Sequence, residues 1–370
     1  MIHTGVPSVS TLLKTPLAAW HGANGAKMAE FAGWDMPIQY PTGIIAEHLH
    51  TRSEAGLFDI CHMGEFILEG PGSGEALGRA LTVNLATLKP GRCRYGFLLN
   101  DKGGLMDDLI VYRLADERWM IVVNAGCRPT DFAALKERLG PSLHLEDVSD
   151  ATAKLDLQGP QSVAVLESVL PGPWRKLPYF GFTEAEFDGG PLLVSRTGYT
   201  GELGFELYFP WDKAEKLWTK LLGDSRVKAV GLGARDTLRL EVGLPLYGHD
   251  LDEHHTPAEA GYAGMLTSQA PYVGRDGAHE VREKLTALVL ADRRSARQGD
   301  AVALPSGESV GIVTSGSFAP SVGAAIALAY IRADAAGASD YVLRTARAEL
   351  PAKAASLPFY TAGTARAALV

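Results

Sequence analysis

The sequence predicts an α+β protein of several domains that ends in a small all-β unit. The chain has 370 residues, which is too long for one ordinary core, and domains of roughly 150 residues would number about two or three. Helix-like and strand-like segments mix without the regular alternation that a parallel α/β sheet requires. After Lys284 the pattern changes to short apolar runs separated by Gly, Pro and Ser, which is typical of a small barrel or sandwich.

The helices expected before this boundary carry apolar side chains at spacings of three and four residues. They cover residues 43–55, 73–81, 130–139, 212–222 and about 235–242. The strands expected between them are short apolar runs, at residues 64–69, 109–113, 119–124, 153–158, 192–196 and 204–209. A polar turn at 115–118 predicts that the second and third of these form a hairpin. No internal repeat period is visible.

The last third of the chain is richer in Ala and Gly than the rest. Its apolar runs predict strands at residues 285–291, 301–304, 308–315, 324–331 and 340–344. The change of pattern near residues 275–285 is the clearest domain boundary in the sequence.

Composition and charge exclude several classes of protein. With 46% apolar and 21% charged residues the chain is expected to fold, because disordered chains are less apolar. A net charge of −8 argues against nucleic acid and against an anionic membrane surface as partners. No apolar run approaches the ~20 residues of a membrane span, and residues 1–13 form a short polar extension without the features of a signal peptide. We therefore expect a soluble, cytoplasmic protein.

The cysteines are few and far apart in the sequence: Cys61, Cys93 and Cys127. An odd number without a C-x-x-C pair suits a reducing compartment better than a disulfide framework. We expect buried, inert thiols, because free cysteine usually behaves as a small apolar residue.

Two generic motifs carry little weight. The run Gly70-Pro71-Gly72-Ser73-Gly74 follows a strand and precedes a helix, but it lacks the Lys and the glycine spacing of a nucleotide-binding loop. It is expected to be a turn. His249, Asp250, Asp252, His254 and His255 match none of the usual zinc spacings, so we expect a hydrogen-bonded loop and no metal.

Three acidic segments are more informative: residues 100–110, 195–206 and 231–236. In the first, a diglycine turn precedes Asp107 and Asp108 at the mouth of an apolar strand. Neighbours in a strand point to opposite faces, so one of the two carboxylates faces inward. An inward carboxylate costs several kcal/mol without a partner, which indicates either a functional group or a turn with an Asx cap.

Further segments combine with these three. They include Thr15-Pro16-Leu17, Phe31-Ala32-Gly33-Trp34-Asp35-Met36-Pro37, Glu47-His48, His62-Met63-Gly64, Leu157-Gln158-Gly159-Pro160, Arg239-Leu240-Glu241, Tyr247-Gly248-His249-Asp250 and Thr314-Ser315-Gly316. Together they resemble the aminomethyltransferase family, the T-protein of the glycine cleavage system. The resemblance covers Thr15 to Phe359.

The resemblance implies a three-domain cloverleaf around a central channel that holds tetrahydrofolate. Its first α+β lobe would comprise residues 1–50 and 150–275, its second, ferredoxin-like lobe residues 51–149, and its barrel residues 280–370. The implied reaction takes an aminomethyl group from the lipoyl arm of H-protein, releases ammonia and passes the methylene to tetrahydrofolate.

The resemblance also assigns residues. Asp108 matches the family's catalytic aspartate near N5 of the folate, where a carboxylate can orient the amine and stabilise iminium character. Glu206 matches the glutamate that accepts the 2-amino and N3–H edge of the pterin. Tyr199 matches a tyrosine of the same site. Arg235 matches an arginine at the folate tail, with an ion pair to Asp236 or Glu241 as the structural alternative.

The remaining assignments are to walls of the site. Met63 and Tyr95 are expected either as its apolar and aromatic walls or as ordinary core residues. Val122 and Asn124 match a strand edge along the pterin, where main-chain contacts would matter more than side chains.

The chain departs from the family pattern at Cys61, where Ser is usual, at Gly261-Tyr262, and after Pro358, where the aromatic-rich ending is replaced. A folate-dependent demethylase of O-, S- or N-methyl donors remains an alternative on the same fold. So does a folate-binding regulator or iron–sulfur assembly factor, although such proteins carry a cysteine-bearing loop where this chain has Ser195 to Glu202.

Overall fold

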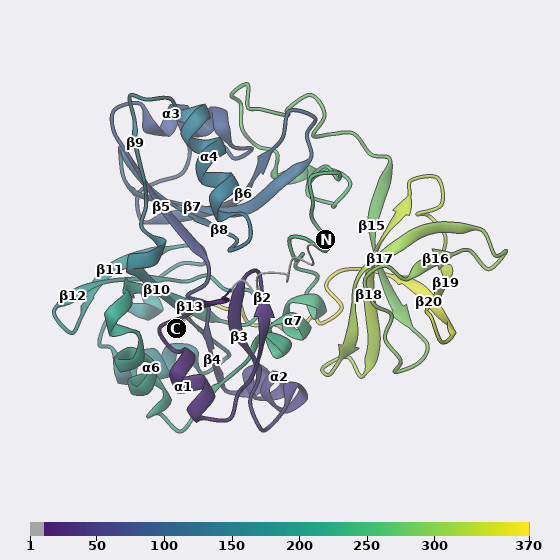
Figure 1. Cartoon of the computed structure of the whole chain (residues 1–370), viewed down its shortest axis with the longest axis horizontal. Helices are drawn as coiled ribbons and strands as arrows, with labels where there is room; N and C mark the ends of the chain where they lie inside the picture. Colours follow the sequence, from purple (N-terminus) through teal and green to yellow (C-terminus); the bar gives the residue numbers. More distant parts are fainter. Residues whose placement is uncertain (1–10, 370) are drawn as a thin grey trace, which may run out of the picture.

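The computed structural model describes residues 11–369, which form two α+β lobes and a C-terminal barrel (Figure 1). The barrel lies on one side of the molecule, and the two lobes lie one above the other on the opposite side in this view. Most of the polar extension expected at residues 1–13 lies outside the described residues. Among residues 11–369, no helix is long and apolar enough to cross a membrane.

The first lobe is built on a six-stranded sheet, in the order β11-β12-β13-β10-β4-β14. The strands are β4 (Ala55–Asp59), β10 (Thr152–Gln158), β11 (Phe182–Phe187), β12 (Gly190–Ser195), β13 (Gly204–Pro210) and β14 (Val227–Ala229). Helices α5 (Ser162–Val169) and α6 (Ala214–Leu222) bury apolar side chains against it. Because β4 pairs with β10 and β14, we propose that the lobe boundary follows Asp59 and not residue 50.

The second lobe is built on a five-stranded sheet, in the order β6-β7-β8-β5-β9. The strands are β5 (Gly64–Glu69), β6 (Arg92–Leu99), β7 (Leu105–Ala115), β8 (Arg118–Val123) and β9 (His144–Asp147). Helices α3 (Ser73–Ala80) and α4 (Arg128–Leu139) complete a βαββαβ unit of ferredoxin-like order, with β6 added at one edge. The expected hairpin is present as β7 and β8.

The two lobes have the same order of elements. In each, a strand and a helix are followed by three strands, a helix and a strand, from β5 to β9 and from β10 to β14. The only difference within the sheets is β4, which lies between β10 and β14. This structural repeat leaves no sequence period, because topology requires only a similar apolar pattern and not similar residues.

The N-terminal segment and helix α7 (Leu232–Glu241) cover the first lobe on the side of the barrel (Figure 1). The segment forms a small sheet of β1 (Leu13–Lys14), β2 (Lys27–Phe31) and β3 (Trp34–Gln39), with helices α1 (Ala18–Ala23) and α2 (Ile44–Ser53). Helix α7 packs against α2, β3 and the barrel. Short 3-10 turns are formed by Ser149–Ala151, Trp174–Lys176, Trp211–Lys213 and Ala263–Met265.

The expected all-β domain is confirmed as a closed six-stranded barrel, in the order β15-β18-β17-β16-β19-β20. Its strands are β15 (Glu283–Leu290), β16 (Ala301–Ala303), β17 (Ser309–Ala319), β18 (Ala324–Arg332), β19 (Asp340–Arg344) and β20 (Glu349–Ala355). Strand β20 pairs with both β19 and β15 and so removes the exposed edges. The sequence did not predict β20, because its Ala, Lys and Pro residues have low strand propensity.

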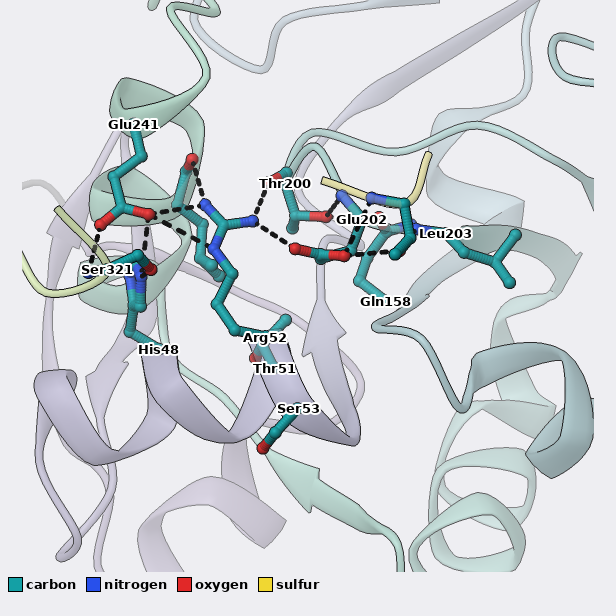
Figure 2. Close-up of polar contacts among 12 residues, drawn as sticks. His48, Thr51, Arg52, Ser53, Gln158, Thr200, Glu202, Leu203, Glu241 and Ser321 are labelled. Carbon is teal, nitrogen blue, oxygen red and sulfur yellow. Dashed lines mark hydrogen bonds and ion pairs between the residues drawn. The ribbon is translucent and has the colours of Figure 1, made fainter. Parts of the chain in front are cut away.

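A buried ion-pair network joins the lobe to the barrel (Figure 2). Arg52 on α2 donates to Glu202 at 2.9 Å and to Glu241 on α7 at 2.8 Å. The other oxygen of Glu241 accepts from the backbone N–H of Ser321, in the β17–β18 turn of the barrel, at 2.7 Å. His48 contacts the Glu241 carboxylate at 3.1 Å.

Candidate active site

A cavity of about 660 Å³ opens between the two lobes. Side chains from β7 and β8 of the second lobe line one part of it, and side chains from β10, β13 and α7 line another. All eight residues that the sequence predicted for the site line this cavity: Met63, Tyr95, Asp108, Val122, Asn124, Tyr199, Glu206 and Arg235. Residues far apart in the sequence therefore meet around one space.

Asp108 on β7 faces the cavity, whereas Asp107 is fully buried within the second lobe. Tyr95 Oη donates to Asp108 Oδ2 at 2.9 Å, and Asn124 Nδ2 donates to Oδ1 at 2.9 Å. Burial, and next the adjacent Asp107 carboxylate, raise the pKa of Asp108 to about 7. At neutral pH this carboxyl can therefore both accept and release a proton.

Asp107 is held by Asn124 and lies near the carboxyl of Asp131 on helix α4. The backbone N–H and the side-chain amide of Asn124 donate to Asp107 at 3.0 and 2.8 Å. Asp131 on α4 is fully buried, and no other donor of the described residues reaches its oxygens. Burial, and next the nearby Asp107 charge, raise the pKa of Asp131 to about 11, so Asp131 keeps its proton at neutral pH.

Glu206 on β13 is a buried carboxylate at the first-lobe side of the cavity. Lys154 Nζ lies 3.2 Å from Oε1, and the Thr197 hydroxyl donates to Oε2 at 2.6 Å. Burial alone would raise the pKa of Glu206, but the Lys154 charge and the Thr197 hydrogen bond lower it below its ordinary value. Tyr208 donates to Oε2 at 3.3 Å, which leaves Oε1 with the fewer partners.

Arg235 on α7 binds neither Asp236 nor Glu241, the partners considered from the sequence. Its Nη1 donates to Asp156 Oδ2 at 2.5 Å, and its guanidinium lies 5.0 Å from the centre of the Tyr199 ring. Asp156 is the direct cross-strand neighbour of Glu206 in the β10–β13 pair. Arg235 therefore lies at the Glu206 end of the cavity.

This position creates a conflict between two expectations. A folate places its pterin and its glutamate at opposite ends of an extended molecule. The expected roles of Glu206 at the pterin and Arg235 at the tail would place the two residues far apart, whereas both lie beside Asp156.

The remaining predicted residues form the walls. Tyr199 donates its hydroxyl to the backbone oxygen of Pro245. Met63 Sδ lies 3.4 Å from Lys154 Nζ, and Val122 is almost fully buried on β8. Tyr95 both lines the cavity and packs edge-on against Phe97, so it belongs to the wall and to the core.

Comparison with known proteins shows that the chain matches two models of one protein family. The model of the family described as GCVT N-terminal domain matches residues 17–269. The model described as glycine cleavage T-protein C-terminal barrel domain matches residues 283–361. The chain belongs to the glycine cleavage T-protein family.

Similar proteins named as aminomethyltransferases support this family assignment. An aminomethyltransferase of Desulforamulus reducens is 40% identical over 361 residues, covering 94% of this chain and 98% of the relative. One from Rubrobacter xylanophilus is 41% identical and covers 95% of each chain. The crystal structure of the glycine cleavage system aminomethyltransferase T from Bartonella henselae superposes with a TM-score of 0.90 at 38% identity, covering 96% and 99% of the two chains. This chain is thus an enzyme of the aminomethyltransferase type.

In this T-protein chain, the acidic and histidine-rich loop after α7 has structural contacts. Asp250 accepts from Arg239 at 2.5 Å and from Ser315 of the barrel at 2.9 Å. Asp252 and Glu283 hold His255 at 2.9 and 3.0 Å. Within residues 11–369, no group of three or more His, Cys, Asp or Glu side chains is placed to hold a metal ion.

The three cysteines are confirmed as buried free thiols. Burial raises the pKa of each thiol above its ordinary value. Cys61, where Ser was expected from the family pattern, donates to the backbone oxygen of Lys154 at 3.3 Å.

Several polar residues of the cavity region were not predicted from the sequence, among them Lys154, Asp156 and His62. The first two alternate with apolar residues along β10, and this alternation was the available signal, because one face of the strand is polar although the lobe is buried. His62 Nδ1 has no hydrogen-bond partner among the described residues. Burial lowers the pKa of His62 to about 4, so the ring is neutral.

Proposed function

We propose that this enzyme transfers the methylene of an aminomethyl group from lipoylated H-protein to tetrahydrofolate and releases ammonia, as a step of glycine cleavage. The observation that carries the proposal is one cavity with Asp108 on one lobe and the ionised Glu206 on the other. The family, whose relatives are aminomethyltransferases, supports it.

The residues around the cavity fit a reduced folate. A volume of about 660 Å³ lies within the range of small-molecule sites, about 300–1,000 Å³. Glu206 Oε1 has acceptor capacity left for the N–H donors of a pterin edge, and an ionised carboxylate makes short, strong bonds to such donors. Tyr199, Met63 and Val122 would supply the flat and apolar walls against which the rings lie.

In the proposed reaction the methylene carbon exchanges its bonds to nitrogen and sulfur for bonds to N5 and N10 of the folate. Ammonia and the lipoyl thiol leave, and the two folate N–H protons go to these leaving groups. Asp108 would orient N5, accept its proton and stabilise positive charge on the developing iminium. The hydrogen bonds from Tyr95 and Asn124 would hold the carboxylate in place during this step.

Arg235 has a different role in this proposal from the one expected from the resemblance. It would close the Glu206 end of the cavity, with Asp156 fixing one edge of the guanidinium. No other hydrogen bond from this guanidinium to a described residue is formed, so its remaining N–H groups are available to a carbonyl oxygen of the ligand.

The test is the release of ammonia and methylenetetrahydrofolate from aminomethylated H-protein. We place the reaction in the cytosol, where the three buried thiols stay reduced.

In the test of ammonia release, methoxy-arene and dimethylsulfonio donors serve as controls for the demethylase alternative. Methyl transfer from these donors without ammonia release from H-protein would replace the proposal with that alternative.

A further inference from the structure

Four charged side chains meet beside the cavity: Lys154, Asp156, Glu206 and Arg235. Asp156 and Glu206 are direct cross-strand neighbours in the β10–β13 pair, where two like charges are destabilising unless each has a partner. Each carboxylate has its own cation. Arg235 Nη1 donates to Asp156 Oδ2 at 2.5 Å, and Lys154 Nζ lies 3.2 Å from Glu206 Oε1. The four side chains therefore form two adjacent ion pairs.

Lys154 is almost fully buried on β10 and nevertheless lines the cavity. An ammonium group has three N–H donors and no acceptor. Among residues 11–369, Glu206 Oε1 is the only oxygen that Lys154 Nζ contacts. Its other neighbours are Met63 Sδ, a weak acceptor at 3.4 Å, and the Tyr208 ring, whose centre is 5.0 Å away. The ammonium group thus keeps donor capacity for an oxygen of a ligand in the cavity.

Glu206 Oε1 and Lys154 Nζ place an acceptor and a donor side by side at the cavity wall. The edge of a pterin carries the complementary pair, because the N3–H donor lies next to the 4-oxo acceptor. Arg235 does not offer this combination, since its hydrogen bond is to Asp156 and it forms none with Glu206.

We propose that Lys154 donates a hydrogen bond to the 4-oxo oxygen of the pterin and so selects 4-oxo pterins against 4-amino pterins. This inference rests on the proposed function. A 4-amino group would turn its N–H donors toward the ammonium group, which leaves buried donors on both sides without an acceptor. A protonated 4-aminopterin would in addition be repelled by the Lys154 charge.

The experiment measures Kd for tetrahydrofolate and for its 4-amino-4-deoxy analogue, both as monoglutamates, on the full-length enzyme by anaerobic calorimetry. The wild type should bind the 4-oxo compound about tenfold or more tightly than the 4-amino compound. In Lys154→Met, which keeps the length of the side chain and removes the donors, the ratio should fall to within about twofold of one. Lys353→Met, at an exposed position of β20, should keep the wild-type ratio.

A second pair of variants covers a loss of stability in Lys154→Met, which leaves Glu206 buried without its cation. Glu206→Gln keeps Lys154 and should keep the preference for the 4-oxo compound, although both compounds bind more weakly. Lys154→Met/Glu206→Gln contains neither charge of the pair and should lose the preference. Thermal unfolding shows that each variant is folded.

Three results would overturn the inference. The first is equal affinity of the wild type for the two compounds. The second is an unchanged ratio in Lys154→Met and in the double variant, which would limit Lys154 to its ion pair with Glu206. The third is a preference that disappears in Arg235→Ala and persists in Lys154→Met, which would assign the 4-oxo group to Arg235. Failure of the wild type to bind tetrahydrofolate at all would contradict the proposed function separately.

Discussion

Asp107 and Asp108 are adjacent in the chain but differ in surroundings, since strand alternation sends one into the lobe and the other to the cavity. Asp108→Asn keeps the shape of the side chain and removes its charge. The activation free energy should therefore rise by about 3–4 kcal/mol, which lowers kcat roughly a hundredfold to a thousandfold. Asp107→Asn should leave kcat within about fivefold, because this side chain does not reach the cavity. Single-turnover formation of methylenetetrahydrofolate at saturating substrates measures both.

The pH profile gives a second view of the same residue. The wild-type single-turnover rate should fall as the pH drops through about 7, because protonation removes the Asp108 charge. The Asp108→Asn variant should not show this fall in rate as the pH drops through about 7. If Asp107→Asn were inactive and Asp108→Asn active, Asp107 would be the catalytic carboxylate. Full activity of both variants would exclude catalysis by either carboxylate.

Glu206 and Arg235 are predicted to act in binding. Glu206→Gln and Arg235→Ala each remove a charge-assisted contact worth about 1.5–3 kcal/mol, so Kd for the folate should rise roughly tenfold to a hundredfold. The rate at saturation should change much less. Equilibrium titration with tetrahydrofolate tests each variant.

An unchanged Kd for the folate in either variant would show that the substituted residue does not bind the folate. Arg235→Ala has a second expected effect, because it leaves the buried Asp156 without its cation. A lower unfolding temperature in the absence of folate, with an unchanged Kd, would assign Arg235 a structural role only.

Asp131 is predicted to make stability depend on pH. Its folded-state pKa of about 11 lies above the unfolded value of about 3.9, so the folded protein binds the extra proton between these limits. The stability that this proton provides is complete below about pH 4 and is lost progressively as the pH rises toward 11. Asp131→Asn should therefore become more stable relative to the wild type from pH 5 to pH 8, as measured by urea unfolding. Asp116→Asn, at an exposed carboxylate, is the matched control, and a constant difference between Asp131→Asn and the wild type would contradict the protonated state.

At the scale of elements, helix α2 carries Arg52, whose ion pairs link it to Glu202 and to Glu241 on α7 (Figure 2). Arg52→Ala leaves Glu202 and Glu241 buried without their cation, which should cost about 3–5 kcal/mol. Arg79→Ala, in an exposed pair with Glu75 on α3, should cost less than about 0.5 kcal/mol. Chemical unfolding compares the two. Similar losses would mean that the buried network does not hold the lobe and barrel together.

At the scale of the whole molecule, we predict folate binding and turnover without a metal ion. Dialysis against a chelator and addition of zinc should both leave activity unchanged, because the loop around Asp250 and His255 is engaged in contacts with the barrel and Arg239. A stoichiometric metal bound by His249, Asp252 and His254, with activity lost on its removal, would show that this loop has been misread.

Local sequence patterns predicted most strands and the boundary before the barrel, and the resemblance to a known family supplied the eight residues that line the cavity. Strand 64–69 was predicted with its observed bounds as β5, because apolar patterning along a segment is a local property. Strand alternation predicted only that Asp107 and Asp108 point to opposite faces, and the resemblance to the family selected Asp108 as the residue of the site.

The partners of these side chains became known from the three-dimensional structure alone. Arg235 on α7 pairs with Asp156 on β10, 79 positions away, and nothing near Arg235 in the sequence indicates this partner. Asp131 on α4 lies near Asp107 on β7, 24 positions earlier in the chain, and the C-terminal tail brings Arg366 next to Arg92 and Arg94. Partners of buried charges depend on the order of strands and on helix packing, which are properties of the whole chain and not of any local segment.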